Sequence, residues 1–187
     1  MIKKINKSSI YFTLPIPGLI ILNTVIRKIK DDELDQMAII WNQHHELITT
    51  SKRVVDREVL INYRISQPDL EYLGCFNSNN VLLGFITIWM EKNGIFINQI
   101  AVHRTHQRKC IATKLIQFVI NRMRNNPDKT ELKLTVMMVN IKALKFFLKL
   151  GFEIIDYTIE KEYLPKTQLK TTEDYLRLAE YKMILFT

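Results

Sequence analysis

The sequence predicts a mixed α/β fold of the α+β type, in which helices flank a mostly antiparallel central sheet. β-rich runs at 70–76, 81–90 and 95–102 follow one another with only short turn segments between them, which favours an antiparallel meander. The order strand–helix–strand–helix from 95 to 150 then indicates a βαβα unit. Because such crossovers are right-handed and join parallel strands, we expect strands 95–102 and 132–138 to be parallel neighbours.

Length and composition fit one globular domain. The chain has 187 residues, of which 47% are hydrophobic and 25% are charged, and a domain commonly holds about 100–200 residues. We therefore expect a single domain over residues 23–187, preceded by an N-terminal extension over 1–22. Pro15 and Pro17 interrupt the apolar run 10–22, so we interpret this run as a packed segment or an edge strand rather than as a secretory leader.

The two cysteines indicate a reducing compartment. Cys75 and Cys110 are too few to form a four-ligand zinc site or to cross-link a small secreted domain. We therefore expect both to be thiols in a cytoplasmic protein that holds no metal.

In the first half of the chain, a strand at 25–29 and two helices precede the meander. Asp31-Asp32-Glu33 places negative charge at the start of a helix, where the helix dipole favours it. The second helix is expected over 53–65. The Asn/Ser cluster at 77–80 and Lys92-Asn93-Gly94 supply the two turns of the meander. The apolar stripe of the first helix consists of Leu34, Met37, Ala38, Trp41 and Leu47.

In the second half, two further helices follow a polar loop at 103–108. The apolar stripe of the first of them consists of Ile111, Leu115, Phe118, Val119 and Met123. Asn140 is a favourable N-cap for a helix over 141–150, and Gly151 is placed for a left-handed C-terminal cap. The remaining expected elements are closing strands at 152–163 and 181–186 and, between them, a loop with a short helix at 164–178.

Positive charge is concentrated in one part of the chain. The net charge is +8, and residues 103–149 contain eleven Lys or Arg against two Asp or Glu (+9), whereas the rest contains sixteen against seventeen (−1). This concentration points to one anionic partner, with a nucleic acid and a polyphosphate cofactor as the leading classes. A solvated basic helix face is the plainer alternative.

Two motifs carry the functional prediction. Gln107-Arg108-Lys109-Cys110-Ile111-Ala112 lies between a strand and a helix, where unpaired backbone N–H groups and the helix dipole can bind an anion. In the second motif, Asn140-x-x-Ala143-x-x-x-Phe147-x-x-x-Gly151-Phe152, Ala143 and Phe147 lie on one helix face beyond the parallel strand. Each motif taken singly is compatible with a structural role, whereas their order and spacing together indicate a function.

These motifs resemble those of the GNAT superfamily of N-acetyltransferases. Residues 97–112 resemble its fourth strand and pyrophosphate loop, and residues 140–152 resemble its Asn-x-x-Ala-x-x-x-Tyr-x-x-x-Gly-Phe helix. The resemblance implies a sheet that is splayed open between strands 95–102 and 132–138, with acetyl-CoA in the split. The partners it implies are acetyl-CoA and an amine acceptor, which is a small amine, a peptide N-terminus or a lysine. No membrane or nucleic acid is implied, and a homodimer stays open.

The resemblance also implies which residues would bind acetyl-CoA. Backbone groups of the fourth strand would pair with pantetheine, amides of the loop would cradle the diphosphate, and Asn140 would hold the pantetheine arm. The charge of residues 103–149 suits a cofactor that carries a diphosphate and a 3′-phosphate. The cofactor-binding residues implied are Ile100, Ala101, Val102, Gln107, Arg108, Lys109, Cys110, Ile111, Ala112, Asn140 and Phe147.

Two of these positions depart from the family pattern. The family glycine is Cys110 here, and because first-turn helical residues have ordinary φ angles, we expect cysteine to fit there at some cost in cofactor binding. The family tyrosine, which is thought to protonate the departing thiolate, is Phe147. Since phenylalanine has no proton to give, water or a tyrosine from elsewhere, such as Tyr157, would serve instead.

The reaction that the resemblance implies is direct attack of a substrate amine on the thioester, without a covalent enzyme intermediate. A general base would deprotonate the ammonium, directly or through water. The candidates are His44, His45 and Glu46 at the end of the first helix, and a water held by Gln99. Each of these side chains could equally be a solvated surface group.

Two other functions stay open at the level of the sequence. A module of the same fold could bind CoA without turnover, as Cys110 and Phe147 suggest. A basic nucleic-acid-binding protein is less favoured, because the basic region has no run of interleaved exposed aromatic residues and its Phe residues are at core-facing spacings. The acceptor itself is not identified, since neither 31–66 nor 163–178 contains a diagnostic pattern.

Overall fold

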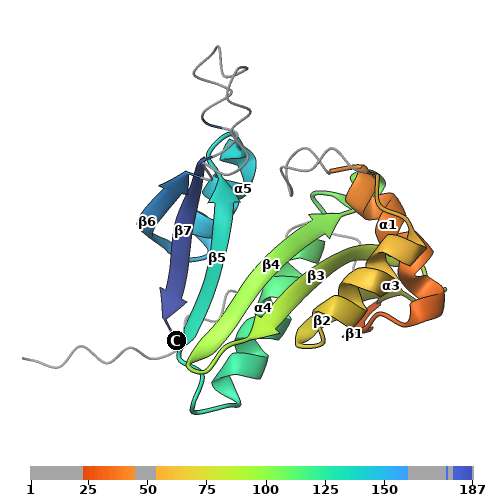
Figure 1. Ribbon diagram of the computed structural model, residues 1–187, viewed down its shortest axis with the longest axis horizontal. Coiled ribbons are helices and arrows are strands. Elements are labelled where there is room, and N and C mark those ends of the chain that lie inside the picture. The colour runs from red at the N-terminus through yellow and green to blue at the C-terminus, as the bar shows by residue number, and fades with distance from the viewer. Residues whose placement is uncertain (1–22, 45–53, 160–175, 177–178, 187) are drawn as a thin grey trace, which may run out of the picture.

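The computed structural model describes residues 23–44, 54–159, 176 and 179–186, which form one sheet with helices on both faces (Figure 1). The strands are β1 (Thr24–Lys28), β2 (Leu70–Asn77), β3 (Leu82–Met90), β4 (Gly94–Val102), β5 (Glu131–Met137), β6 (Glu153–Ile159) and β7 (Ala179–Phe186). The α-helices are α1 (Leu34–Asn42), α3 (Arg57–Ser66), α4 (Ile111–Arg124) and α5 (Ile141–Lys149), and two short 3₁₀ turns are η1 (Asp31–Glu33) and η2 (Arg104–His106).

The seven strands lie in the order β1-β2-β3-β4-β5-β7-β6. β4 and β5 are parallel, and every other pair of neighbours is antiparallel. The predicted mixed, mostly antiparallel sheet is therefore confirmed, as are the meander and the parallel crossover through α4.

The sheet is split between β4 and β5. Their parallel pairing covers only four residue pairs, from Gly94↔Glu131 to Ile97↔Leu134. The β3–β4 register then shifts, because Ile88 pairs with Ile97 while Thr87 pairs with Gln99, so Asn98 is the extra residue of a β-bulge. Figure 1 shows β4 and β5 diverging beyond this point. The split that the family resemblance implies is thus present.

Two hydrophobic clusters hold the helices to opposite faces of the sheet. α1 and α3 pack over β2 and β3, where Trp41 stacks on Phe85 with ring centroids 6.0 Å apart. α4 and α5 pack on the other face, over a cluster that includes residues of β3, β4, β5 and β7. Gly84 permits the close approach of α4, because a Cβ there would lie 2.8 Å from the carbonyl oxygen of Ala101 and 3.1 Å from the Ile111 side chain.

Two details of the helices differ from expectation. α3 begins at Arg57 because Asp56 caps it, with the Oδ1 atom accepting a 2.8 Å hydrogen bond from the Val59 N–H. Phe118 was expected in the buried stripe of α4, but this prediction is wrong: Phe118 is 36% exposed. It precedes the buried Val119 and therefore lies about 100° around the helix axis from it, on the solvent side.

Several expectations fall outside the described residues. They concern the N-terminal extension 1–22, Leu47, the candidate bases His45 and Glu46, and nearly all of the loop at 164–178. The boundaries of the single domain, 23–187, also stay a prediction. Among the helices that the structure describes, none is long and apolar enough to cross a membrane.

Candidate active site

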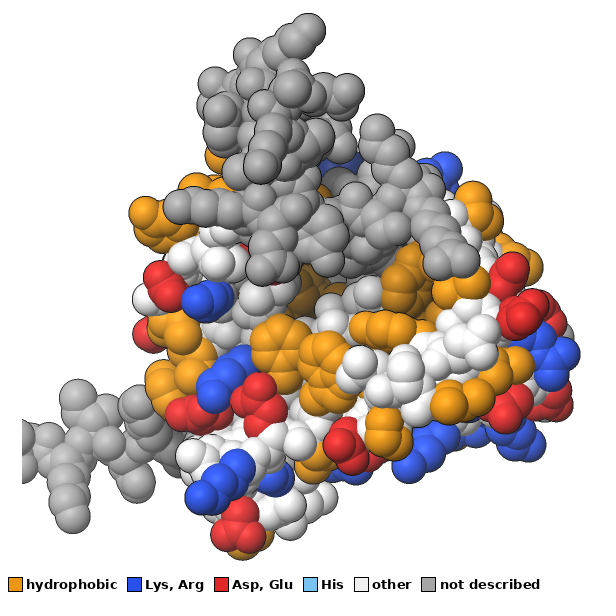
Figure 2. Space-filling model, in the orientation of Figure 1, with side chains coloured by type: hydrophobic (Ala, Val, Ile, Leu, Met, Phe, Trp, Pro, Cys, Tyr) orange, Lys and Arg blue, Asp and Glu red, His pale blue; other side chains and the backbone are white. Residues whose placement is uncertain are grey.

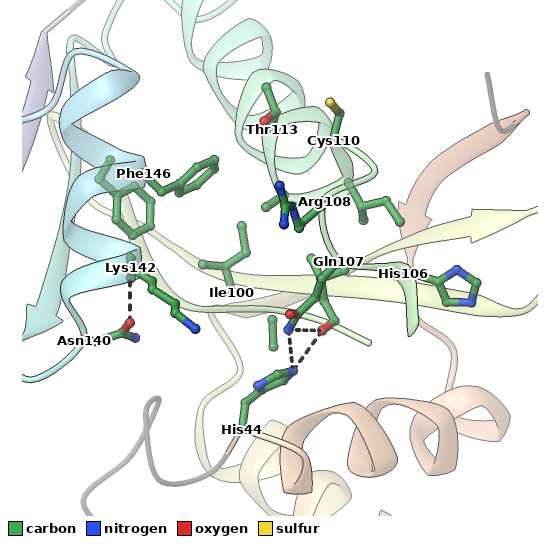
Figure 3. Close-up of a pocket in the computed structure, with 16 residues that line it drawn as sticks. His44, Ile100, His106, Gln107, Arg108, Cys110, Thr113, Asn140, Lys142 and Phe146 are labelled. Carbon is green, nitrogen blue, oxygen red and sulfur yellow. Dashed lines mark hydrogen bonds between the residues drawn. The ribbon is translucent and has the colours of Figure 1, made fainter. Parts of the chain in front are cut away.

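A cavity of about 490 Å³ lies where β4 leaves β5 (Figure 3). The end of β4, the loop before α4 and the first turns of α4 and α5 form its walls. The structure brings all the expected cofactor residues to this cavity except Lys109. The lining residues that the sequence did not indicate for the cofactor are His44, His106, Thr113, Lys142, Ala143 and Phe146.

The edge of β4 offers unpaired backbone groups to this cavity. The N–H of His103 donates a 2.9 Å hydrogen bond to the carbonyl of Leu83 in β3. In that trans peptide the Val102 carbonyl points the opposite way, into the split. Because backbone groups alternate along a strand, Ile100 also presents its N–H and C=O to the split, whereas those of Ala101 face β3. Ala101, although it lines the cavity, therefore does not offer its backbone to a ligand there.

His44, just beyond the end of α1, is hydrogen-bonded to one of these backbone groups. Its Nε2 lies 2.9 Å from the Val102 carbonyl oxygen, and the Gln107 Nε2 lies 3.5 Å from the same oxygen. Because a carbonyl only accepts, the His44 Nε2 carries the hydrogen and Nδ1 is the unprotonated ring nitrogen. Burial lowers the pKa of His44, and the nearby Arg104 and His103 lower it further, against the opposing effect of the Val102 hydrogen bond. The lowered pKa favours the neutral imidazole near pH 7.

The loop before α4 is built from two left-handed residues. Arg108 has a φ of 60° and Cys110 has φ 59° and ψ 16°. Cys110 is thus the N-cap of α4, not a first-turn residue with ordinary helical φ, and the expectation about its backbone is wrong. A left-handed residue followed by a helical one directs successive N–H groups to one side, a geometry that can accommodate an anion. The strained backbone at Cys110 is the cost of forming this cradle with a residue other than glycine.

The charge around the cavity is positive. Arg108 and Lys142 line it, and Figure 3 shows Lys142 reaching into it from α5. Among the described residues of its lining there is no Asp or Glu. Not all of the predicted charge is directed here, however. Arg122 pairs with Glu71 at 2.7 Å, Lys133 pairs with Glu131 at 2.7 Å, and the Lys129 Nζ donates to the Lys92 carbonyl at 2.8 Å.

The second motif forms the opposite wall. Asn140 caps α5, with its Oδ1 accepting a 3.1 Å hydrogen bond from the Ala143 N–H, and it lines the cavity. Phe147 is 4% exposed and packs edge-to-face on Phe152, with centroids 5.4 Å apart. Gly151 has a φ of 91°, which confirms the predicted left-handed cap. The ring at 147 therefore shapes the wall and offers no hydroxyl.

A smaller cavity of about 90 Å³ lies deeper in the split, between β4 and β5. Asn140, Ala143 and Phe147 line both cavities, so the two are neighbours. Gln99 lines the smaller one, and its Oε1 atom is buried without a hydrogen-bond partner. Glu180 of β7 also lines it, although no sequence pattern indicates this residue.

The other expected site residues lie elsewhere. Tyr157 is on β6, is 62% exposed and lines neither cavity, and Lys109 lines neither. Of the lining residues that sequence reasoning missed, Lys142 had a readable signal, since it follows the Asn140 cap by two residues. Glu180 had none, because only the position of β7 beside β5 brings it to the split.

Comparisons with known proteins agree with this architecture. The model of the acetyltransferase (GNAT) family matches residues 33–152, more than half of the chain. No curated protein matches the sequence. Three similar solved structures share the fold. Spermidine N-acetyltransferase from Vibrio cholerae in complex with CoA and spermine is 13% identical, and the match covers 87% of this chain and 95% of that chain with a TM-score of 0.69. The structure of yncA from Salmonella typhimurium with its cofactor acetyl-CoA is 19% identical, with coverages of 88% and 94% and a TM-score of 0.65. Ribosomal-protein-S18-alanine N-acetyltransferase from Escherichia coli is 16% identical, with coverages of 87% and 93% and a TM-score of 0.65.

Proposed function

This chain belongs to the acetyltransferase (GNAT) family and is an acyltransferase, and we propose that it transfers the acetyl group of acetyl-CoA to a primary amine within a complex that holds both substrates. The observation that carries the proposal is the edge of β4 that β5 leaves uncovered, where the backbone groups of Ile100 face the split and the Val102 carbonyl is bonded by His44. This edge lies in the wall of the larger cavity, between the left-handed loop before α4 and α5. Such an edge can accept an extended ligand as an additional strand.

The residues around the cavity fit acetyl-CoA. The N–H groups of the left-handed loop and the side chains of Arg108 and Lys142 suit the diphosphate. The backbone groups of Ile100 and the Val102 N–H suit the amides of pantetheine, whereas the Val102 carbonyl is bonded by His44. Asn140 lies at the end of the split where the arm would pass. Bound acetyl-CoA would supply an activated acyl group as a thioester, and the thiol, of pKa ~8.5, is a tolerable leaving group.

The chain's own residues have three tasks in this mechanism. The β4 edge would hold the carbonyl oxygen of the acyl group by a backbone N–H. Gln99 cannot take up a proton but can hold a water in the smaller cavity. We propose that His44, which lines the larger cavity and whose pKa is lowered by burial, accepts the proton of the acceptor ammonium at Nδ1, directly or through water. Phe147 has no proton to give and, among the described residues, Tyr157 lines neither cavity, so we propose that water protonates the departing thiolate.

The test has a binding step and a turnover step. Calorimetry should detect one site for acetyl-CoA, and acetyl-CoA should slow iodoacetamide labelling of the exposed Cys110 while the buried Cys75 serves as an internal control. CoA release should then be measured over panels of amines, amino acids and peptides. Binding without transfer would identify a CoA-binding module, and the absence of binding at millimolar acetyl-CoA would overturn the proposal.

A further inference from the structure

Gln99 and Glu180 lie on the same face of the sheet, on either side of the split. Ala101 belongs to the cluster beneath α1 and α3, and Gln99, two residues earlier on β4, shares its face. On β7, Tyr181 packs into the other cluster, beneath α4 and α5, so the adjacent Glu180 points to the face of Gln99. Both line the smaller cavity.

Two polar groups of this cavity, on Gln99 and Glu180, lack a side-chain partner in the described part of the chain. The Gln99 Oε1 is buried without a partner. Glu180 is the one carboxylate that lines either cavity among the described residues, and within that part of the chain no side chain pairs with it. A buried acceptor without a donor is unfavourable, which applies to the Gln99 Oε1, whereas Glu180 is a partly exposed carboxylate without a counter-charge among the described side chains. A ligand that brings several N–H donors and a positive charge would satisfy both groups.

We propose that Glu180 and Gln99 bind the ammonium group of the acceptor, so that the acceptor is a primary amine that arrives as a cation on the face covered by α1 and α3. The inference rests on the proposed function and adds the acceptor-binding residues to it. Figure 2 shows this face, where hydrophobic side chains lie over the middle of the sheet and charged ones toward its rim. A cation that reaches the split there finds its counter-charge in Glu180.

The arrangement separates the two substrates by charge. Arg108 and Lys142 line the larger cavity, where they favour an anionic ligand and repel a cation. Glu180 lines the smaller cavity, where it does the opposite. Asn140 and Phe147 line both cavities. The acceptor nitrogen would therefore be held at the boundary between the two cavities, beside the β4 edge that would hold the acyl group.

The inference is tested by comparing a cation with a neutral molecule of the same shape. Dissociation constants of n-butylamine, which is an ammonium at pH 7, and of 1-butanol would be measured by ligand-observed NMR on CoA-loaded protein. We expect wild type to prefer the amine at least fivefold and Glu180→Gln to abolish the preference. Glu180→Asp, which keeps the charge, should retain part of it.

Two controls separate this inference from the proposed function. Glu153→Gln removes an exposed carboxylate of β6 that lines neither cavity, and it should keep the full preference. The affinity of Glu180→Gln for CoA, measured by calorimetry, should stay within twofold of wild type, which also shows that the variant is folded. An unchanged amine preference in Glu180→Gln would overturn the inference alone, whereas absence of CoA binding by wild type would overturn the proposed function.

Discussion

Replacing Cys110 by glycine should stabilise the protein. Cys110 has φ 59°, a conformation that costs a residue with a Cβ about 1–2 kcal/mol and costs glycine nothing. Glycine in turn loses about 0.5–1 kcal/mol more backbone entropy on folding. The difference predicts a gain of about 0.5–1 kcal/mol in the free energy of unfolding. For a chain of this size, at about 2–4 °C per kcal/mol, Tm should rise by roughly 1–4 °C.

The free energy of unfolding would be measured by urea denaturation, with the dependence on urea concentration (the m-value) unchanged between variants, and Tm by thermal unfolding. Cys110→Ser keeps the Cβ and removes only the thiol, so it should show no comparable gain. Asn80→Gly is the matched control for backbone conformation, because Asn80 has φ 57° but asparagine tolerates this region. A Cys110→Gly variant no more stable than Cys110→Ser would refute the assignment of strain to this position.

Three further predictions concern the site. Asn140→Ala and Asp56→Ala should each lose a helix cap at about 1 kcal/mol, measured by urea unfolding, but only Asn140→Ala should also weaken acetyl-CoA binding in calorimetry. Arg108→Gln and Lys142→Gln should weaken acetyl-CoA binding. Both variants should also flatten the dependence of acetyl-CoA affinity on salt between about 0.05 and 0.5 M, a range over which charge screening changes strongly. His44→Gln should reduce the loss of stability on acidification. The pKa of His44 in the folded protein lies below its ordinary value of 6.5, so the unfolded chain binds more protons than the folded one. The free energy of unfolding of wild type therefore falls as the pH drops below about 6.5.

Each of these predictions has a clear contrary result. Equal effects of Asn140→Ala and Asp56→Ala on acetyl-CoA affinity would leave Asn140 as a cap only. An unaltered salt dependence in the Arg108 and Lys142 variants, like that expected of the remote Arg124→Gln, would remove these cations from the cofactor site. Identical stability profiles of wild type and His44→Gln between pH 7 and 5 would show that His44 is not held neutral by the fold.

The fold was largely predictable because its signals are local. The apolar spacing of α4, the cap at Asn140 and the terminator at Gly151 are each contained within a few residues, and all three are present in the structure. The exposure of Phe118 was not predictable in this way. Its spacing fits a stripe as well as that of Ile116 or Ile120, and only the packing of α4 on the sheet decides which of them is buried.

The site was predictable only in part, because local sequence signals identify its motifs but not the residues that distant strands bring to it. The loop and the α5 motif each follow a strand directly, so the parallel crossover brings them to one cavity. The left-handed backbone of Cys110 was missed, because cysteine has no preference for that conformation and nothing in its neighbours indicates it. Glu180 was missed because its place depends on β7 entering the sheet beside β5, a pairing between segments about forty residues apart.

The strand order also has a consequence for synthesis on the ribosome. β7 lies between β5 and β6, and it pairs along its length with both (Figure 1). Since domains fold as residues emerge, at about 5–20 residues per second, β6 has no partner in the described sheet until residues 179–186 have left the exit tunnel. Until then neither β6 nor the edge of β5 that faces β7 has its partner strand. A premature stop before Ala179 would thus leave two unpaired strand edges, a target for chaperones and proteases.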